Sequence, residues 1–439
     1  MLRIIRILML LSLLTVALVA VEAQAATPAI DVLTVKGAIN PVVADYIKRG
    51  IAHAEETNAT AVIIQLDTPG GLDTSMRDIV QDIVSARVPV VVYVAPSGAR
   101  AASAGVFITV AAHVAAMAPN TAIGAAHPVS IGAEGESAMS EVMEGKVVND
   151  AAAYIRSIAE AHGRNMEWAE QAVRESVSAT EQEALELNVI DMVAPDLPSL
   201  ISRLDGHQVT MLGGTTVTLE TQTAVINHLS MNTIEDFLYV ISDPNIAYLL
   251  LSLAMLGLFV EISNPGLIFP GIIGAIALLL AFFSLGMLPV NYAGVLLIVL
   301  AFALFIAEVF TSSFGLFTGG GLVALVLGSL ILFKGGPLFR VNPWLIASIA
   351  AFLTALFTLI VSQVIGAHRR QAFTGKEELT GKTATVLVPL APEGIVRYRG
   401  ERWTAISEAG RVEPGEDVVI DRVDSLKLYV TRKKQEESR

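Results

Sequence analysis

The sequence contains no cysteine. Disulfide bonds, thiolate metal sites and thiol-based catalysis are therefore excluded. Charged residues are also scarce: they make up 16% of the 439 residues, whereas 53% are hydrophobic. This balance is too apolar for one soluble domain and predicts membrane-spanning segments. The formal net charge of -13 argues against a nucleic-acid partner, because binding to phosphates requires a basic surface.

Lysine is rare over most of the chain. Between residues 27 and 333 there are only three, Lys36, Lys48 and Lys146. A reaction in this region that needs a lysine as its base therefore has few candidates. Lys36 ends an expected strand and Lys48 lies on the polar face of an expected helix, so Lys146 is the best placed of the three.

The N-terminus has the layout of a secretory signal peptide. Arg3 and Arg6 precede an apolar run over residues 7–21, and the Ala-Gln-Ala of residues 23–25 supplies a small-x-small cleavage site. We expect residues 1–26 to be this signal, with an uncleaved membrane helix as the alternative. In either case the next domain is expected to start outside the cytoplasm.

Residues 27–230 alternate between apolar strand patterns and amphipathic helix patterns. Strands are expected at residues 30–35, 60–66, 88–94, 114–117 and 189–193. Helices are expected at residues 41–56, 74–86, 146–162, 166–175 and 181–187, with another opened by Ser103. Buried apolar strands that alternate with helices indicate parallel βαβ units. The small and polar residues 129–145 predict a mobile loop.

The remaining chain divides by composition. After a connector at residues 231–245, residues 246–368 form an expected transmembrane region. Its apolar stretches are residues 246–262, 267–288, 292–310, 316–333 and 344–366. A spanning helix needs about 20 apolar residues, so four or five of them can span, and the first is the weakest because it is short and ends at Glu261.

The C-terminal part returns to soluble character. Residues 375–433 contain five short alternating runs separated by glycine and proline. Five short strands in such a length predict a small barrel of the OB type. Residues 434–439 are a charged tail.

Ser103 is the best nucleophile candidate in the chain. It lies among the small residues 98–105, directly after an expected buried strand, where a carbonyl group can approach closely. A second small-residue site, the Asp-Thr-Pro-Gly-Gly of residues 67–71, follows the neighbouring strand. Its glycines leave backbone N–H groups unobstructed. The N–H groups of Gly71 and Ala104 are therefore the expected donors to an oxyanion.

A serine hydroxyl needs an adjacent base that is deprotonated near neutral pH. Lysine has a solution pKa of about 10.4, and lowering it by about three units costs about 4 kcal/mol, which burial in an apolar site can supply. Lys146 fits, because two valines follow it. His127 is the rival base, again among small residues. No pair of histidines or carboxylates has the spacing of a metal site, and no metal or cofactor is expected.

Three segments resemble the NfeD family of membrane-bound serine proteases, which belongs to the ClpP/crotonase superfamily. They are residues 67–71, residues 101–105 (Ala-Ala-Ser-Ala-Gly) and residues 117–125. The order of modules matches the long form of that family over the whole chain: a signal peptide, a ClpP-like domain, several spans and an OB barrel. The resemblance implies an α/β ClpP/crotonase-like spiral domain for residues 27–230.

The resemblance also implies a Ser–Lys dyad. Ser103 matches the serine. Lys146 matches the lysine, which starts a helix after a flexible loop and precedes a Tyr-Ile-Arg-Ser segment, here residues 154–157. His127 falls near the place of the ClpP histidine, but no aspartate lies near residues 173–176. Because an unsupported histidine makes a poorer triad, Lys146 ranks above His127.

Further expectations concern activity and partners. The resemblance implies a serine endopeptidase that is multi-pass in the cell membrane, acts on the extracytoplasmic side, and cleaves an apolar segment of a stomatin- or flotillin-like membrane protein. Because ClpP-like domains pair or form rings, a homodimer or higher homo-oligomer is expected, with membrane lipid as the other partner. The alternatives are a non-catalytic scaffold for a stomatin-like partner and a crotonase-type acyl-CoA enzyme. A secreted domain has little access to CoA, which disfavours the second.

Overall fold

The computed structural model describes residues 28–128, 141–311, 315–334, 339–369 and 379–433. The chain divides into two compact units, Met1–Phe357 and Thr358–Arg439, and each is described by itself. The expected signal peptide at residues 1–26 and the tail at residues 434–439 lie outside the described residues.

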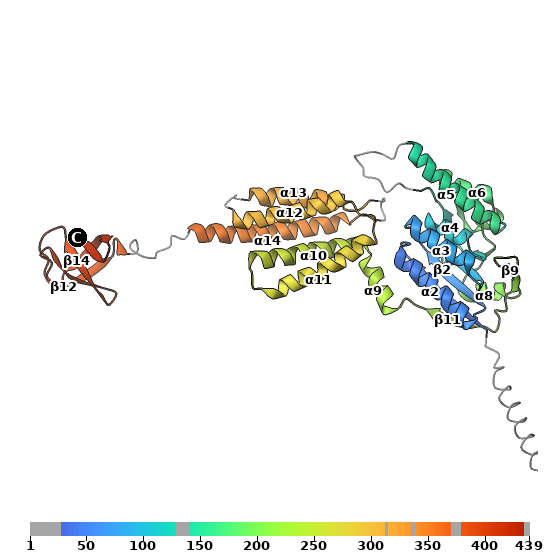
Figure 1. The fold of residues 1–439 in the computed structure, drawn as a ribbon, viewed down its shortest axis with the longest axis horizontal. Helices are drawn as coiled ribbons and strands as arrows, with labels where there is room; N and C mark the ends of the chain where they lie inside the picture. Colours follow the sequence, from blue (N-terminus) through green and yellow to red (C-terminus); the bar gives the residue numbers. More distant parts are fainter. Residues whose placement is uncertain (1–27, 129–140, 312–314, 335–338, 370–378, 434–439) are drawn as a thin grey trace, which may run out of the picture. The chain divides into compact units, whose positions relative to one another are not determined.

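A parallel sheet forms the centre of the first domain, as predicted, but β11 (Val225–Leu229), one of its six strands, was not expected (Figure 1). Its strand order is β11-β1-β2-β3-β5-β8, and every neighbouring pair in it is parallel. The strands are β1 (Ala29–Lys36), β2 (Ala61–Asp67), β3 (Val90–Val94), β5 (Val114–Met117), β8 (Met192–Val193) and β11 (Val225–Leu229). All six carboxyl ends therefore point to the same edge of the sheet, where sites in open α/β sheets form.

Side chains alternate between two buried layers, one on each face of the sheet. Val62 and Ile64 of β2 enter one core, whereas Ile63 enters the other. The first core is completed by α2 (Pro41–Thr57), α3 (Asp73–Ser85), α4 (Ala104–Val110), α5 (Glu141–Ala161), α6 (Met166–Arg174) and α7 (Glu181–Glu186). The second is completed by α8 (Leu197–Leu204) and the hairpin of β9 (Gln208–Thr210) and β10 (Thr216–Thr218). Burial on both faces explains why the strands are continuously apolar.

Several elements differ from the sequence-based expectation. A small sheet of β4 (Arg100–Ala102), β6 (Ala122–Gly124) and β7 (Ser178–Thr180) was not predicted. The helix α9 (Thr233–Ile241) lies inside the expected connector. Helix α5 begins at Glu141 rather than at Lys146, so the loop predicted for residues 129–145 is wrong over residues 141–145, while residues 129–140 lie outside the described residues.

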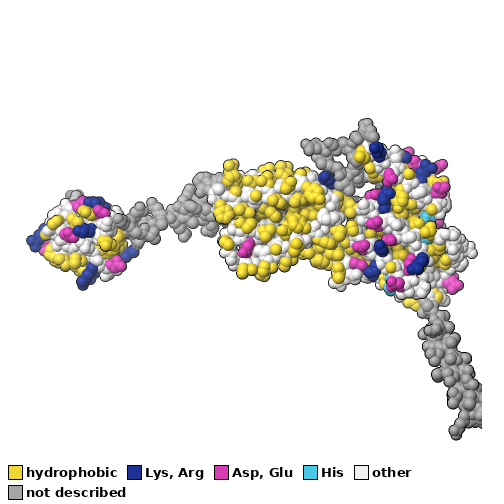
Figure 2. Space-filling model, in the orientation of Figure 1, with side chains coloured by type: hydrophobic (Ala, Val, Ile, Leu, Met, Phe, Trp, Pro, Cys, Tyr) yellow, Lys and Arg dark blue, Asp and Glu magenta, His cyan; other side chains and the backbone are white. Residues whose placement is uncertain are grey.

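Five apolar helices follow α9 within the described residues. They are α10 (Pro244–Ser263), α11 (Ile268–Gly286), α12 (Tyr292–Phe310), α13 (Leu316–Leu330) and α14 (Pro343–Arg369). By length and composition, α10, α11 and α12 can each cross a membrane, which is fewer than the four or five expected. The first stretch has the lowest mean hydropathy of the three, 2.1 against 2.4 and 2.7, but its helix continues past Glu261 to Ser263 and is long enough to span. Figure 2 shows hydrophobic side chains over most of the visible surface of these helices.

The C-terminal unit contains a closed five-stranded barrel, as predicted. Its strand order is β12-β13-β14-β16-β15, in which β14 and β16 are parallel and the other pairs are antiparallel. The strands are β12 (Thr383–Val388), β13 (Glu393–Tyr398), β14 (Glu401–Ser407), β15 (Asp417–Asp424) and β16 (Lys427–Arg432). Alternate residues such as Val386, Val418 and Val430 fill its interior, which is the period-2 pattern of the sequence.

A buried arginine holds the end of α4. Arg164 donates hydrogen bonds to the carbonyl oxygens of Val110 and Ala112 and to the carboxylate of Asp191, the last at 2.7 Å. Asp191 in turn accepts from the backbone N–H of Ala115 at 2.6 Å. A cation at a helix C-terminus complements the helix dipole. Arg164 therefore anchors the helix that begins directly after Ser103.

Two histidine rings beside this arginine make the domain sensitive to acid. Burial and the charge of Arg164 lower the pKa of His113 and of His162 to about 4. Below the ordinary histidine pKa of about 6.5 the unfolded chain binds protons that the folded chain does not. We expect the free energy of unfolding of residues 27–243 to be flat above pH 7 and to fall between pH 6.5 and 4, by at most about 3 kcal/mol for each ring.

Denaturant unfolding at pH 7.5, 6 and 5 measures this loss. His162→Phe should remove about half of the pH dependence, and His207→Gln, a histidine outside the pair, is the comparison variant. An unfolding free energy that stays constant between pH 7 and 5 would contradict the assignment.

Candidate active site

Ser103 occupies the turn between β4 and α4. Its backbone has φ 52° and ψ -113°, a conformation that residues other than glycine rarely adopt. Its N–H donates to the carbonyl of Gly124 at 3.2 Å, which holds the turn against β6. Strained backbone of this kind costs of the order of 1–3 kcal/mol and concentrates at functional sites. The serine at the strand-to-helix turn is therefore where the sequence predicted it, in a geometry that the sequence did not reveal.

The two glycines of the predicted second site lie against this turn. A Cβ atom on Gly70, where φ is +121°, would lie 2.8 Å from the Cβ of Ser103. A Cβ atom on Gly71 would lie 2.0 Å from the carbonyl oxygen of Ile39. The Gly70 N–H donates to the Oγ1 of Thr68 at 3.0 Å, which fixes the turn after β2. Gly71 thus requires glycine because the Ile39 backbone approaches closely, and Gly70 because its φ is positive and the Ser103 side chain lies against it.

A cavity of about 430 Å³ opens beside Ser103. Four of the predicted site residues line it: Ser103, Lys146, Gly71 and Ala104. The other lining residues are Asp73, Met76, Arg77, Phe107, Ala126, Pro128, Val147, Asp150, Ala151 and Phe339. The wall is mainly apolar, and it combines residues from α3, α4 and α5 with Phe339, which precedes α14.

Two backbone donors remain available in this wall. Ala104 is the first residue of α4, so its N–H has no acceptor within the helix. The N–H of Gly71 has no hydrogen-bond partner among the described residues, since the backbone bonds of this segment run from Ile39 to Gly70 and from Leu72 to Ile39. Donors of this kind suit a developing oxyanion.

Lys146 lies in the second turn of α5 with an exposed side chain. Within the described residues neither the Lys146 amine nor the Ser103 hydroxyl has a hydrogen-bond partner, so the two groups share a cavity without touching. Hydrogen bonds between catalytic groups are often long in a free enzyme and shorten when substrate binds. The burial that was expected for Lys146 is not present in this state of the chain.

The ring of His127 contacts the backbone of α6. Its Nδ1–H donates to the carbonyl oxygen of Val173 on α6 at 2.8 Å. Its neighbours Ala126 and Pro128 line the cavity, but His127 is not among the lining residues. Val173 stands where a triad would require an aspartate. Among the described residues no group of three or more histidine, aspartate or glutamate side chains could hold a metal ion.

Sequence reasoning missed Arg77. Its guanidinium donates to Asp73 at 2.8 Å and to Asp150 at 2.6 Å, and it lies over the ring of Tyr154 at 4.5 Å from the centroid. Asp150 and Tyr154 follow Lys146 at successive turns of α5, so Arg77 fastens the lysine-bearing helix to α3. The pair of Arg77 with Asp73 can be expected from the sequence, because the two residues are four apart on one helix. The pair of Arg77 with Asp150 cannot, because 73 residues separate them.

We expect Arg77→Gln to loosen α5. The contacts are partly exposed, so together they contribute about 1 kcal/mol. Amide hydrogen exchange along the first half of α5 should accelerate about three- to tenfold. Arg87→Gln is the matched control, because Arg87 makes a similar pair with Glu55 away from this cavity. Unchanged exchange in α5 would show that Arg77 does not hold the helix.

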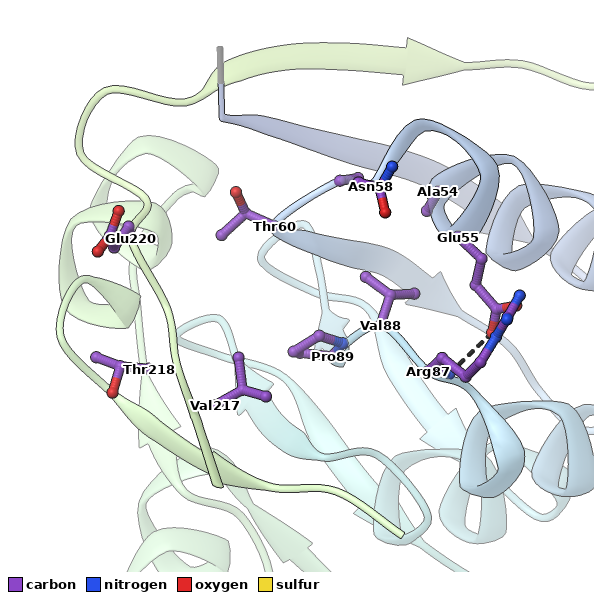
Figure 3. Close-up of a pocket in the computed structure, with 11 residues that line it drawn as sticks. Ala54, Glu55, Asn58, Thr60, Arg87, Val88, Pro89, Val217, Thr218 and Glu220 are labelled. Atoms are coloured by element: carbon purple, nitrogen blue, oxygen red, sulfur yellow. Dashed lines mark hydrogen bonds and ion pairs between the residues drawn. The ribbon is translucent and has the colours of Figure 1, made fainter. Parts of the chain in front are cut away.

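A second cavity, of about 500 Å³, lies at the other edge of the sheet (Figure 3). It is lined by Thr60 before β2 and by Pro89 before β3, and the pair of Arg87 and Glu55 stands at one side of it. Sites in parallel sheets form at the carboxyl ends of the strands. This cavity is at the amino ends, so the Ser103 cavity is the better candidate.

A parallel α/β domain with a serine on a strained strand-to-helix turn, followed by apolar helices and a closed barrel, defines a modular membrane protein with a candidate serine active site. Three family descriptions match in order: the N-terminal domain of NfeD1b over residues 29–196, the NfeD integral membrane domain over residues 245–363, and the NfeD-like C-terminal, partner-binding domain over residues 376–432. The chain belongs to the NfeD family, which confirms the resemblance.

Relatives match along nearly the whole length. The membrane-bound protease PH1510 of Pyrococcus horikoshii is 40% identical over 416 residues, which cover 92% of this chain and 93% of that protein. The membrane protein NfeD1b of Bacillus subtilis is 27% identical, with 93% of each chain covered. A solved structure of a lysine-to-alanine mutant of the 1510-N membrane-bound stomatin-specific protease, in complex with a substrate peptide, is 36% identical with a TM-score of 0.45. That match covers 49% of this chain and 98% of the other.

Proposed function

We propose that this chain is a membrane-tethered serine endopeptidase in which Ser103 is the nucleophile and Lys146 the general base. One observation carries the proposal: a single cavity is lined by Ser103, Lys146, Gly71 and Ala104. The 40% identity to a membrane-bound protease over nearly the whole chain supports the reaction class. The cavity supplies a nucleophile, a base and two oxyanion donors, which is the set that acyl transfer to serine requires.

In the proposed mechanism each of these groups has a step. The neutral amine of Lys146 takes the proton of the Ser103 hydroxyl while the Oγ attacks the scissile carbonyl carbon. The carbonyl oxygen becomes an oxyanion that accepts hydrogen bonds from the N–H groups of Gly71 and Ala104. The ammonium then gives its proton to the leaving amine. Water, deprotonated by the same amine, hydrolyses the acyl-enzyme and restores Ser103.

The substrate class follows from the wall of the cavity. Met76, Phe107, Val147 and Ala151 present apolar surface around Ser103, which suits an apolar peptide segment. 1510-N is described as stomatin-specific, and the chain carries the domain described as partner-binding. The proposed substrate is therefore an apolar segment of a stomatin- or flotillin-like membrane protein.

The remaining parts of the proposal concern placement and assembly. The protease domain lies on the extracytoplasmic side, as the N-terminal signal pattern indicates, and acts as a homodimer or higher homo-oligomer. Catalysis through His127 is the alternative, but His127 is not among the residues that line the cavity beside Ser103. A non-catalytic scaffold for a stomatin-like partner is the other alternative, and the unused donors and strained Ser103 weigh against it.

The test is cleavage by the purified full chain in lipid nanodiscs. Fluorogenic peptides with an apolar centre, and a stomatin-like membrane protein, are incubated with it and the products are mapped by mass spectrometry. Cleavage within apolar segments, with labelling of Ser103 by a fluorophosphonate as further support, agrees with the proposal. Binding of the stomatin-like protein without any cleavage would favour the scaffold.

A further inference from the structure

Helix α9 joins the α/β domain to the first spanning helix. It begins at a capping box, in which Asn232 accepts from the N–H of Glu235 and the Glu235 carboxylate accepts from the N–H of Asn232. Two residues, Ser242 and Asp243, separate its end at Ile241 from the start of α10. This helix therefore lies directly before the point where the chain enters the membrane.

Both ends of α9 are fixed by contacts. On the side of the α/β domain, Glu235 pairs with Arg49 of α2 at 2.7 Å, and the hydroxyl of Tyr239 donates to the carbonyl of Lys36 at 2.7 Å. On the membrane side, the carbonyl of Ile241 accepts a hydrogen bond from the hydroxyl of Ser284 in α11. The helix is thus a rigid connection rather than a flexible linker.

The outer face of α9 is apolar and uncovered. Ile234, Phe237 and Val240 are 70%, 49% and 50% exposed. They recur every three residues, which at 100° per residue places them on one arc of about 120°. Glu235 and Tyr239 lie on the opposite side, against the α/β domain. A soluble protein rarely leaves such an arc in water.

We propose that Ile234, Phe237 and Val240 are buried at the boundary between lipid headgroups and acyl chains, so that α9 is an interfacial helix. The family's integral membrane domain begins at residue 245, and α10 can cross a membrane from Pro244. The apolar arc is therefore continuous with the lipid-facing surface. An amphipathic helix at this level lies in the plane of the interface. Because α9 carries no lysine or arginine, the contact does not depend on anionic lipid.

The contact also restricts the α/β domain. The Tyr239 hydroxyl donates to the carbonyl of Lys36 at the end of β1. Three residues further along the chain, the N–H of Ile39 donates to the carbonyl of Gly70. A short, ordered path therefore connects the lipid-bound helix with the glycine turn beside Ser103. Lipid around α9 limits how far this turn can move from the bilayer surface.

The lack of cysteine makes a direct test possible. Phe237→Cys is labelled with a nitroxide in the full chain, in phosphatidylcholine nanodiscs, and its collisions with oxygen and with a water-soluble nickel chelate are measured by electron paramagnetic resonance. Two controls use the same chain: Asp236→Cys, an exposed neighbour on α9, and Leu212→Cys, an apolar residue that is 70% exposed between β9 and β10.

Burial in lipid predicts an oxygen-to-nickel ratio about threefold higher at Phe237 than at either control, because oxygen concentrates in acyl chains and the chelate stays in water. Ile234→Cys and Val240→Cys should show the same pattern, which guards against a local disturbance by one substitution. Equal ratios at Phe237 and Leu212 would overturn the proposal. Low collision with both reagents would also overturn it, by indicating a protein partner, and spin–spin broadening would identify that partner as a second copy. No peptide is cleaved in this measurement, so its failure is separate from failure of the proposed protease activity.

Discussion

Ser103→Ala is expected to abolish peptide hydrolysis, with kcat/KM lower by roughly 10,000-fold or more. Alanine keeps the Cβ atom and the packing against Gly70, so the change removes only the hydroxyl. The remaining oxyanion donors bind a carbonyl oxygen but provide no attacking group. The measurement is turnover of an apolar fluorogenic peptide by the full chain in nanodiscs, with burst kinetics as a readout of the acyl-enzyme.

Ser85→Ala is the matched control, since Ser85 ends α3 and its hydroxyl contacts only the backbone of that helix. It should retain activity within about twofold, because surface changes of this kind have small effects. Circular dichroism of both variants should match the parent chain. Retained turnover in pure Ser103→Ala would remove Ser103 from the mechanism, whatever the state of the other groups.

The fold was largely predictable because its main signals are local. Buried parallel strands give unbroken apolar runs, as in residues 88–94, and the Asn40-Pro41 pair marks the start of α2 by capping chemistry. The three-residue strands β4, β6 and β7 could not be found in this way. They are too short for a period-2 pattern, and they form only because the turns around Ser103 and Gly124 bring them together.

The site was predictable in its members but not in its arrangement. Small residues after neighbouring parallel strands must meet at one sheet edge, which is why Ser103 and Gly71 could be paired in advance. The role of Arg77 depends on its contacts with Asp150 and Tyr154, which lie more than 70 residues further along the chain. A local sequence pattern does not predict contacts between residues so far apart. The exposure of Lys146 was also unexpected: Val147, beside it in sequence, is itself 39% exposed and therefore does not bury the lysine.

The base is distinguished by a set of three variants. Lys146→Ala should lower kcat/KM by about 1,000-fold. Lys146→Arg should be equally inactive, because a guanidinium stays charged and cannot accept the serine proton. His127→Ala should lose less than about tenfold, since its ring supports backbone at Val173 and does not line the cavity. Lys48→Ala, an exposed lysine on α2, controls for a general effect of losing positive charge.

The exposed position of Lys146 sharpens this prediction. The proposed step brings this amine to the Ser103 hydroxyl, so bound substrate must shield it from water. Peptides long enough to fill the apolar wall of the cavity should then gain in kcat and not only in KM, because they remove water from the amine. In Lys146→Ala this gain in kcat with length should vanish while the gain in affinity remains. If His127→Ala is inactive and Lys146→Ala remains active, His127 is the base instead.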